Sequence, residues 1–319
     1  MNIFKSKNLI KYAVSMGILA VLALQMDFSS LRQQVGGLNV GFFFLSLILI
    51  VCQILFLNLR WHSYLNVGRQ DISFQTSTLI NLAGYFANIL FITSVGGILA
   101  KSALAVRCGL SVFQAVFATF LDRFMTLFAL VFFSAIGLPL LYGIVDDKIN
   151  ILLGLSISLI VIVVAGALIL LRSGMLKEYI LSNRKRSRIV GMLRSYTENY
   201  KLMLETAGYS LIAQGCFILA VYALSLGIDD GGHNVHALEF IALVPVLALI
   251  ASLPISWGGW GIREGAFIYG LGLIGYSMEG AFFLSVQVGL VTLIAPFFVG
   301  LPYLLRADLK SFWLSVRGA

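Results

Sequence analysis

The chain has 319 residues, of which 60% are hydrophobic and only 11% are charged. Soluble domains carry about 25% charged and about 45–50% apolar residues, so this composition excludes an ordinary soluble protein. The net charge of +8 comes from basic residues beside apolar runs. It therefore indicates membrane topology and anionic lipid head groups as partners, and not nucleic acid.

Six apolar segments are long enough to cross about 30 Å of hydrocarbon as helices, so the sequence predicts an all-α polytopic membrane protein. In chain order they cover residues 9–26, 40–57, 112–142, 151–171, 207–228 and 280–305. Two more apolar segments, 76–106 and 237–276, are interrupted by polar and glycine-containing breaks. Residues 172–206 form a basic linker between the fourth and fifth spans.

The distribution of basic residues orients the predicted spans, because lysine and arginine gather on the cytoplasmic side of membrane proteins. Both termini, the loop near Arg60 and Arg69 and the basic linker are expected in the cytoplasm. The acidic loops near Asp146 and Asp229 are expected outside. Each interrupted segment must then begin and end on the same side of the membrane, so we predict two hairpins.

The order of elements, which is span, span, hairpin, span, occurs twice. We predict one transmembrane domain, residues 1–319, with half-repeats 8–147 and 150–306 and six spanning helices plus two re-entrant hairpins. Because the second half begins from the opposite side, the repeat has inverted topology. The alternative is an irregular bundle of eight or ten helices in which both hairpins cross fully.

The breaks in the two hairpins predict a central site for an anion. The glycine pairs are Gly96 and Gly97 in the first break and Gly258 and Gly259 in the second. Irregular backbone at membrane depth needs protein or a water-filled cavity around it, and the helix after each break begins with free N–H groups. Lys101 and Arg263 add positive charge there. Close packing by the glycines and snorkelling by the cations is the alternative reading.

Asp122 and Arg123 lie about 15 Å along a predicted span, where ionisable residues are functional hypotheses by default. Because adjacent residues point about 100° apart on a helix, we expect one of them to pair across the bundle with Lys101, Arg263 or Glu264. A structural lock, a substrate site and proton coupling stay open for Asp122, and the same ambiguity applies to Glu264.

Several other polar and aromatic residues have two readings. Trp257 and Trp260 flank the second break and either pack as interfacial anchors or line an acyl tunnel. Asn88 lies in the first hairpin. Arg60, with its neighbours Asn58 and Trp61, is interpreted as an ordinary membrane-interface belt.

Catalysis finds little support in the sequence. His62, His233 and His236 lie in loops on opposite sides of the predicted membrane, and the three cysteines are scattered. There is no P-loop and no nucleophile elbow. We therefore expect no enzyme activity, no cofactor and no metal site.

Four motifs, taken in order, carry a resemblance to a known family. They are residues 84–88 (GYFAN), 96–101 (GGILAK), 122–123 (DR) and 254–265 (PISWGGWGIREG). With these motifs the chain resembles the lysylphosphatidylglycerol synthase transmembrane region family over about residues 8–306. The first hairpin departs from the family, in which a proline is usual near Thr93, an acidic residue near Ile98 and an arginine where Lys101 stands.

The resemblance implies lipid handling by a stand-alone member without the synthase domain, in a bacterial inner membrane. The expected function is that of a flippase-like transporter for an anionic phospholipid or a polyprenyl-phosphate-linked lipid, driven downhill or by protons. An intramembrane enzyme acting on lipid-linked substrates is one alternative. The other is an accessory subunit of a lipid-synthesis complex, and a homo-oligomer or a lipid-synthesis partner stays open.

Overall fold

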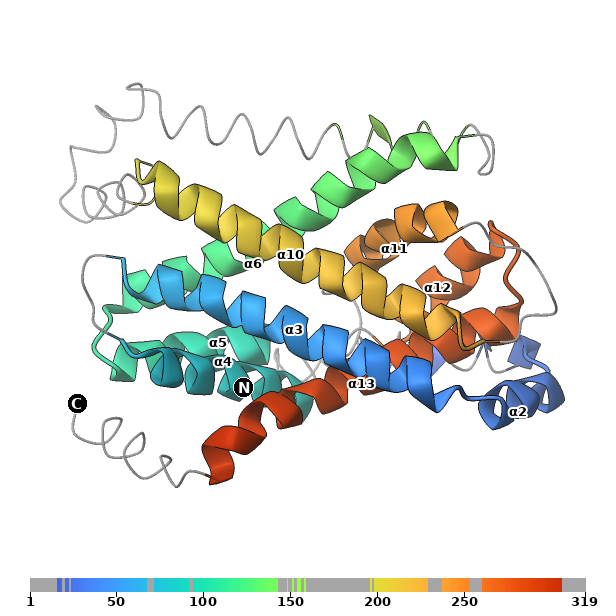
Figure 1. Cartoon of the computed structure of the whole chain (residues 1–319), viewed down its shortest axis with the longest axis horizontal. Helices are drawn as coiled ribbons and strands as arrows, with labels where there is room; N and C mark the ends of the chain where they lie inside the picture. Colours follow the sequence, from blue (N-terminus) through green and yellow to red (C-terminus); the bar gives the residue numbers. More distant parts are fainter. Residues whose placement is uncertain are drawn as a thin grey trace.

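The computed structural model consists of helices over the residues that it describes. It describes residues 16–18, 21–22, 24–67, 72–91, 94–142, 148, 151, 154–155, 158, 196, 198–228, 237–252 and 260–305. Within these ranges the regular elements are helical, in agreement with the predicted all-α class (Figure 1).

Within the part of the chain that the structure describes, four helices are long and apolar enough to cross a membrane. They are α3 (Val40–Leu65), α6 (Val112–Gly137), α10 (Tyr200–Ser225) and α13 (Met278–Leu305), and α6 continues into the 3-10 turn η1 (Leu138–Leu141). A helix of 26 residues, such as α3, is about 39 Å long, which exceeds the hydrocarbon core. These helices coincide with four of the six predicted spans. The other two, 9–26 and 151–171, lie largely outside the described residues.

Polar side chains at the helix starts explain where three of the long helices begin. Asn39 accepts the N–H of Gly41 at 3.0 Å ahead of α3, and Asn199 accepts the N–H of Leu202 at 3.0 Å ahead of α10. Ser111 and Gln114 form a reciprocal capping box at the start of α6. Such caps satisfy N–H groups that the first helical turn leaves without partners.

Two pairs of shorter helices occupy the predicted hairpins. The first pair is α4 (Phe74–Phe91) with α5 (Ser94–Arg107), and the second is α11 (Ala237–Ala251) with α12 (Ile262–Gly272). The members of each pair pack on one another, and the two pairs lie at opposite ends of the molecule's long axis (Figure 1). The predicted break at Gly96 and Gly97 is displaced, because α5 already begins at Ser94 and both glycines are helical.

The four helices α3 to α6 and the four helices α10 to α13 make corresponding contacts. The most extensive contact joins α3 to α10, which run in opposite directions, as α6 and α13 also do (Figure 1). If α3, α4, α5 and α6 are matched in order with α10, α11, α12 and α13, each contact has a counterpart. Thus α3 contacts α13 as α10 contacts α6, and α4 contacts α13 as α11 contacts α6.

A short helix, α2 (Phe28–Gly36), packs against α13 at the end of the molecule that also holds α11 and α12 (Figure 1). Its N-cap residue Asp27 donates its backbone N–H to Glu279 at 3.0 Å. The main apolar core lies among α3, α10, α11, α12 and α13. A second apolar cluster surrounds Trp61 where α3, α4, α5 and α6 meet.

Candidate functional site

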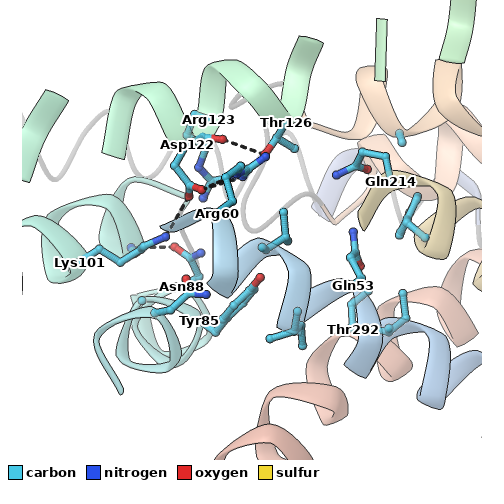
Figure 2. Close-up of a pocket in the computed structure, with 18 of the residues that line it drawn as sticks. Gln53, Arg60, Tyr85, Asn88, Lys101, Asp122, Arg123, Thr126, Gln214 and Thr292 are labelled. Carbon is cyan, nitrogen blue, oxygen red and sulfur yellow. Dashed lines mark hydrogen bonds and ion pairs between the residues drawn. The ribbon is translucent and has the colours of Figure 1, made fainter. Parts of the chain in front are cut away.

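A polar cavity of about 290 Å³ lies between helices of both halves (Figure 2). Most of its polar lining comes from α3, α4, α5 and α6, and α10, α11 and α13 close the other side. The charged and hydrogen-bonding side chains that line it are Gln53, Arg60, Asn81, Tyr85, Asn88, Lys101, Asp122, Arg123, Thr126, Gln214 and Thr292.

Helical periodicity brings these side chains to the cavity. On α3 the lining residues are Ile50, Gln53, Ile54, Leu57 and Arg60, which recur every three or four positions and so occupy one face. This face extends over about 15 Å of the helix. It is apolar towards Ile50 and charged at Arg60, so the cavity has one charged end and a less polar opposite end.

The charged end is built around Asp122 on α6. Its Oδ1 accepts hydrogen bonds from Arg60 Nη2 at 2.7 Å and Arg60 Nε at 3.0 Å, and its Oδ2 accepts one from Lys101 Nζ at 2.9 Å. Arg60 is only 1% exposed and Asp122 is 8% exposed. One carboxylate therefore joins α3, α5 and α6 through two charge-assisted contacts (Figure 2).

Arg60 and Lys101 are held by further contacts. Arg60 donates to Ser210 on α10 at 2.9 Å and to Thr126 on α6 at 2.8 Å. The Lys101 ammonium lies 4.1 Å from the ring centre of Trp61, a cation–π contact. The Lys101 stem packs so closely on Gly84 that a Cβ there would lie 2.8 Å from the Lys101 Cδ. The position of both cations is thus set before any ligand binds.

The charges on the cavity wall do not balance. Among the described residues of the lining, three cationic side chains, Arg60, Lys101 and Arg123, face a single carboxylate, which gives an excess of two positive charges. Arg123 is exposed, and it forms no hydrogen bond or ion pair with any residue that the structure describes. The excess favours an anion in the cavity.

Two amide side chains in the cavity also lack partners. Asn81 on α4 is 4% exposed and Gln214 on α10 is 3% exposed, and neither forms a side-chain hydrogen bond within the described ranges. Figure 2 shows Gln214 and Gln53 reaching into the same space. Buried amides without partners are costly, so these groups are placed to bond water or the polar part of a ligand.

Arg263 and Glu264 form a second charged cluster, away from the cavity lining. Arg263 Nη2 lies 2.5 Å from Glu264 Oε1, and Arg263 Nε donates to Ser285 of α13 at 3.2 Å. The guanidinium stacks on Trp260 at 4.7 Å and lies against Gly289 of α13. Glu264 is fully buried. The sequence placed Arg263 in the same cavity as Lys101, whereas in the structure Arg263 is not part of the lining of that cavity.

Side chains cap the helix starts that were expected to offer free N–H groups to an anion. Asn88 Oδ1 accepts the N–H of Gly97 at 2.7 Å, and Glu264 Oε2 accepts the N–H of Gly261 at 2.5 Å. Gly261 has φ 87°, a conformation that favours glycine. The backbone N–H groups of Gly97 and Gly261 are therefore occupied by side chains, and side-chain cations supply positive charge to the cavity.

The structure gathers part of the predicted site and separates the rest. Lys101, Asp122, Arg123, Asn88 and Gly97 line one cavity, and Asp122 pairs with Lys101 as expected. Gly96 precedes Gly97 in α5 but is not part of the lining. Arg263, Glu264 and Trp260 belong to the second cluster. Trp257, Gly258 and Gly259 lie outside the described residues.

Arg60 is a site residue that the sequence did not predict, since it reads there as part of an interface belt together with Asn58 and Trp61. All three side chains are buried, and Asn58 donates to Thr78 of α4 at 2.5 Å. The available signal was periodicity, because Arg60 lies on the same helical face as Gln53 and Leu57. Among the described residues, no group of three or more His, Cys, Asp or Glu side chains is placed to hold a metal ion.

Comparison with known families shows to which family the chain belongs. The lysylphosphatidylglycerol synthase TM region family matches residues 8–300. The chain belongs to this family. Its membership agrees with the resemblance carried by the hairpin motifs and connects the chain with membrane lipids. No curated protein matches the chain.

Proposed function

We propose that the chain is a lipid transporter of the flippase type, which binds an anionic lipid head group in the cavity between the hairpin α4–α5 and helices α3 and α6. The observation that carries the proposal is the excess of two positive charges on the lining of a cavity beside membrane-spanning helices. Charged groups at membrane depth are expensive and usually mark a path for a substrate or an ion.

The size of the cavity supports a head group as the occupant. Its volume of about 290 Å³ is close to the lower limit of the 300–1,000 Å³ range of small-molecule sites. A head group fits such a volume, and the acyl chains stay in the surrounding lipid. The unpartnered amides of Asn81 and Gln214 would then bond the polar part of the head group.

The short hairpin helices support re-entrant segments. Helices α5, α11 and α12 have 14, 15 and 11 residues, whereas a spanning helix needs about 20. Each hairpin would therefore enter and leave on one side, and the opposite positions of the two hairpins support an inverted repeat (Figure 1). The basic residues of the sequence favour termini on the cytoplasmic side.

The repeat provides a mechanism for transport. Lys101 and Arg263 both follow the first glycine of their pair by five residues, and each is paired with a carboxylate and stacked on a tryptophan. Only the Lys101 side lines the cavity. We propose that the two halves exchange these arrangements, so that the Arg263 side opens when the Lys101 side closes.

The test is transport by the purified protein in vesicles that contain a fluorescent anionic phospholipid. Replacing Lys101 with methionine (Lys101→Met) removes the charge but keeps a long apolar side chain against Gly84 and Trp61. A charge-assisted contact contributes about 1.5–3 kcal/mol, so its loss predicts that the variant translocates the lipid at least about tenfold more slowly than the unchanged protein. The matched control is Lys201→Met, since Lys201 is exposed on α10 and outside the cavity.

Normal transport by a folded Lys101→Met protein would exclude the cavity as the head-group site. Absence of translocation by the unchanged protein, with every lipid offered, would argue against transport and favour the accessory-subunit alternative.

A further inference from the structure

Arg123 lies on the lipid-facing stripe of α6. Val116, Phe120 and Leu127 recur at the same helical spacing, and all three are exposed apolar side chains. The apolar stretch Val112–Leu141 is 30 residues long, so Arg123 lies within about 5 Å of its middle along the axis. This arginine is therefore neither buried in the bundle nor near an end of the helix.

Arg123 also lines the cavity, although Val116, Phe120 and Leu127, which share its face of α6, are exposed. It thus marks the place where the cavity meets the outer surface of the bundle. An arginine at membrane depth without a partner is costly. No described residue forms an ion pair or hydrogen bond with it. An anion that reaches the cavity from the bilayer would remove this cost.

The charge of that anion follows from the other cavity residues. Arg60 and Lys101 share the single carboxylate of Asp122, so their combined charge is only half neutralised. Arg123 adds one more positive charge. A head group with two negative charges would balance the lining, whereas a phosphodiester with one charge would leave one cation uncompensated, and a zwitterionic head group would leave two.

Resting on the proposed function, we infer that Arg123 is the residue that receives a lipid phosphate at a lateral entrance to the cavity, and that the preferred head group carries two negative charges. The chemical class is a phosphate monoester or diphosphate at the end of a lipid. The phosphate binds Arg123 at the entrance and the Arg60–Lys101 pair inside, while the tails remain among the exposed apolar residues of α6.

The experiment measures binding of defined lipids to the purified full chain in detergent. Phosphatidate, phosphatidylglycerol and phosphatidylcholine with identical acyl chains supply two, one and no net negative charges at pH 8. The expected order of affinity follows these charges, with phosphatidate at least about tenfold tighter than phosphatidylglycerol, since a charge-assisted bond contributes about 1.5–3 kcal/mol. Inorganic phosphate as a competitor separates a lipid site from a site for free phosphate.

Variants of Arg123 test whether this residue is responsible for the preference for phosphatidate. Arg123→Gln should bind phosphatidate at least about tenfold more weakly and lose most of the preference for it. Arg123→Lys, which keeps the charge, should retain most of both. The matched control Arg107→Gln changes an exposed arginine at the end of α5, outside the cavity, and should bind as the unchanged protein does. Thermal unfolding of each variant checks the fold.

Each outcome decides a different claim. Equal affinity for phosphatidate and phosphatidylglycerol would overturn the preference for two charges but leave the proposed lipid site in place. Full binding by a folded Arg123→Gln protein would overturn the role of Arg123. Failure of the unchanged protein to bind any anionic lipid would contradict the proposed function as well, and displacement of phosphatidate by equimolar inorganic phosphate would overturn the lipid as the source of the phosphate.

Discussion

Asp122 is the one carboxylate among the described residues that line the cavity, and it pairs with both Arg60 and Lys101. It holds Arg60 and Lys101 in place and thereby connects three helices. Because both carboxylate oxygens are occupied by cations, its role in the proposed transporter is to position Arg60 and Lys101 for the head group, which it would itself repel.

Replacing Asp122 with asparagine (Asp122→Asn) keeps the shape but leaves two buried cations without a counter-charge. Breaking a buried pair by removing one partner typically costs about 3–5 kcal/mol, so we expect a large fall in unfolding temperature in detergent. The matched control Asp27→Asn alters an exposed N-cap carboxylate and should cause a much smaller fall. Equal falls for the two variants would contradict the assigned role.

The sequence predicted that Asp122 or Arg123 pairs across the bundle with Lys101, Arg263 or Glu264. The observed pair of Asp122 with Lys101 is one of these, but the contribution of Arg60 was not predicted. A charge deep in a predicted span requires a partner, and this physical demand is visible in a linear sequence. Arg60 lies near a span end, where topology and snorkelling explain a basic residue equally well. Only the packing of α3 against α6 and α10 shows that the side chain points into the bundle.

At the scale of elements, the first hairpin depends on close approach of its two helices. A Cβ on Gly97 would lie 2.6 Å from the Gly84 carbonyl oxygen, which is closer than real contacts allow. Gly97 therefore serves packing of α5 on α4, one of the two readings open from the sequence. Hydropathy located the four spans that fall within the described residues, since it reports composition directly. The start of α5 at Ser94, ahead of both glycines, could not be read from composition.

Gly97→Ala tests this packing. The added methyl group must push α5 away from α4, so we expect a destabilisation of about 1–3 kcal/mol, as for overpacked cores, and weaker lipid binding as Lys101 shifts. Gly208→Ala is the control, because a Cβ at that helical position of α10 has no neighbour within 4 Å. Alanine is the better helix former by about 1 kcal/mol, so Gly208→Ala should leave stability unchanged or raise it. Unfolding temperature and lipid affinity are measured for both.

At the scale of the whole molecule, two observations together favour a protein with two states. The contacts of α3, α4, α5 and α6 are repeated by α10, α11, α12 and α13, yet among the described residues the Lys101 side lines the cavity and the Arg263 side, with its fully buried Glu264, does not. In the proposed inverted repeat, each half adopts in turn the arrangement of the other. The order of segments in the sequence predicts this repeat, but which half lines the cavity is a property of packing alone.

The ion pair of Arg263 with Glu264 should stabilise the state in which the Lys101 side lines the cavity, and so oppose this exchange. Glu264→Gln removes the charge that holds Arg263 and still leaves an oxygen to cap Gly261. It should therefore weaken the Arg263 cluster and shift the population towards the state in which the Arg263 side is open and the Lys101 side is closed. The readout is labelling of a single cysteine, Thr292→Cys, by a water-soluble maleimide after the three native cysteines are replaced. Thr292 lines the cavity, and its hydroxyl bonds only backbone oxygens of its own helix.

Labelling of this cysteine should become several-fold slower in the Glu264→Gln protein, since the cavity would be open for a smaller fraction of the time. The control Glu205→Gln, an exposed carboxylate on α10, should label at the unchanged rate. If the cavity is static, the cysteine should be labelled at the same rate in the protein without a further substitution, in Glu264→Gln and in Glu205→Gln. That result would leave lipid binding on the Lys101 side in place, but it would contradict the exchange of states between the two halves.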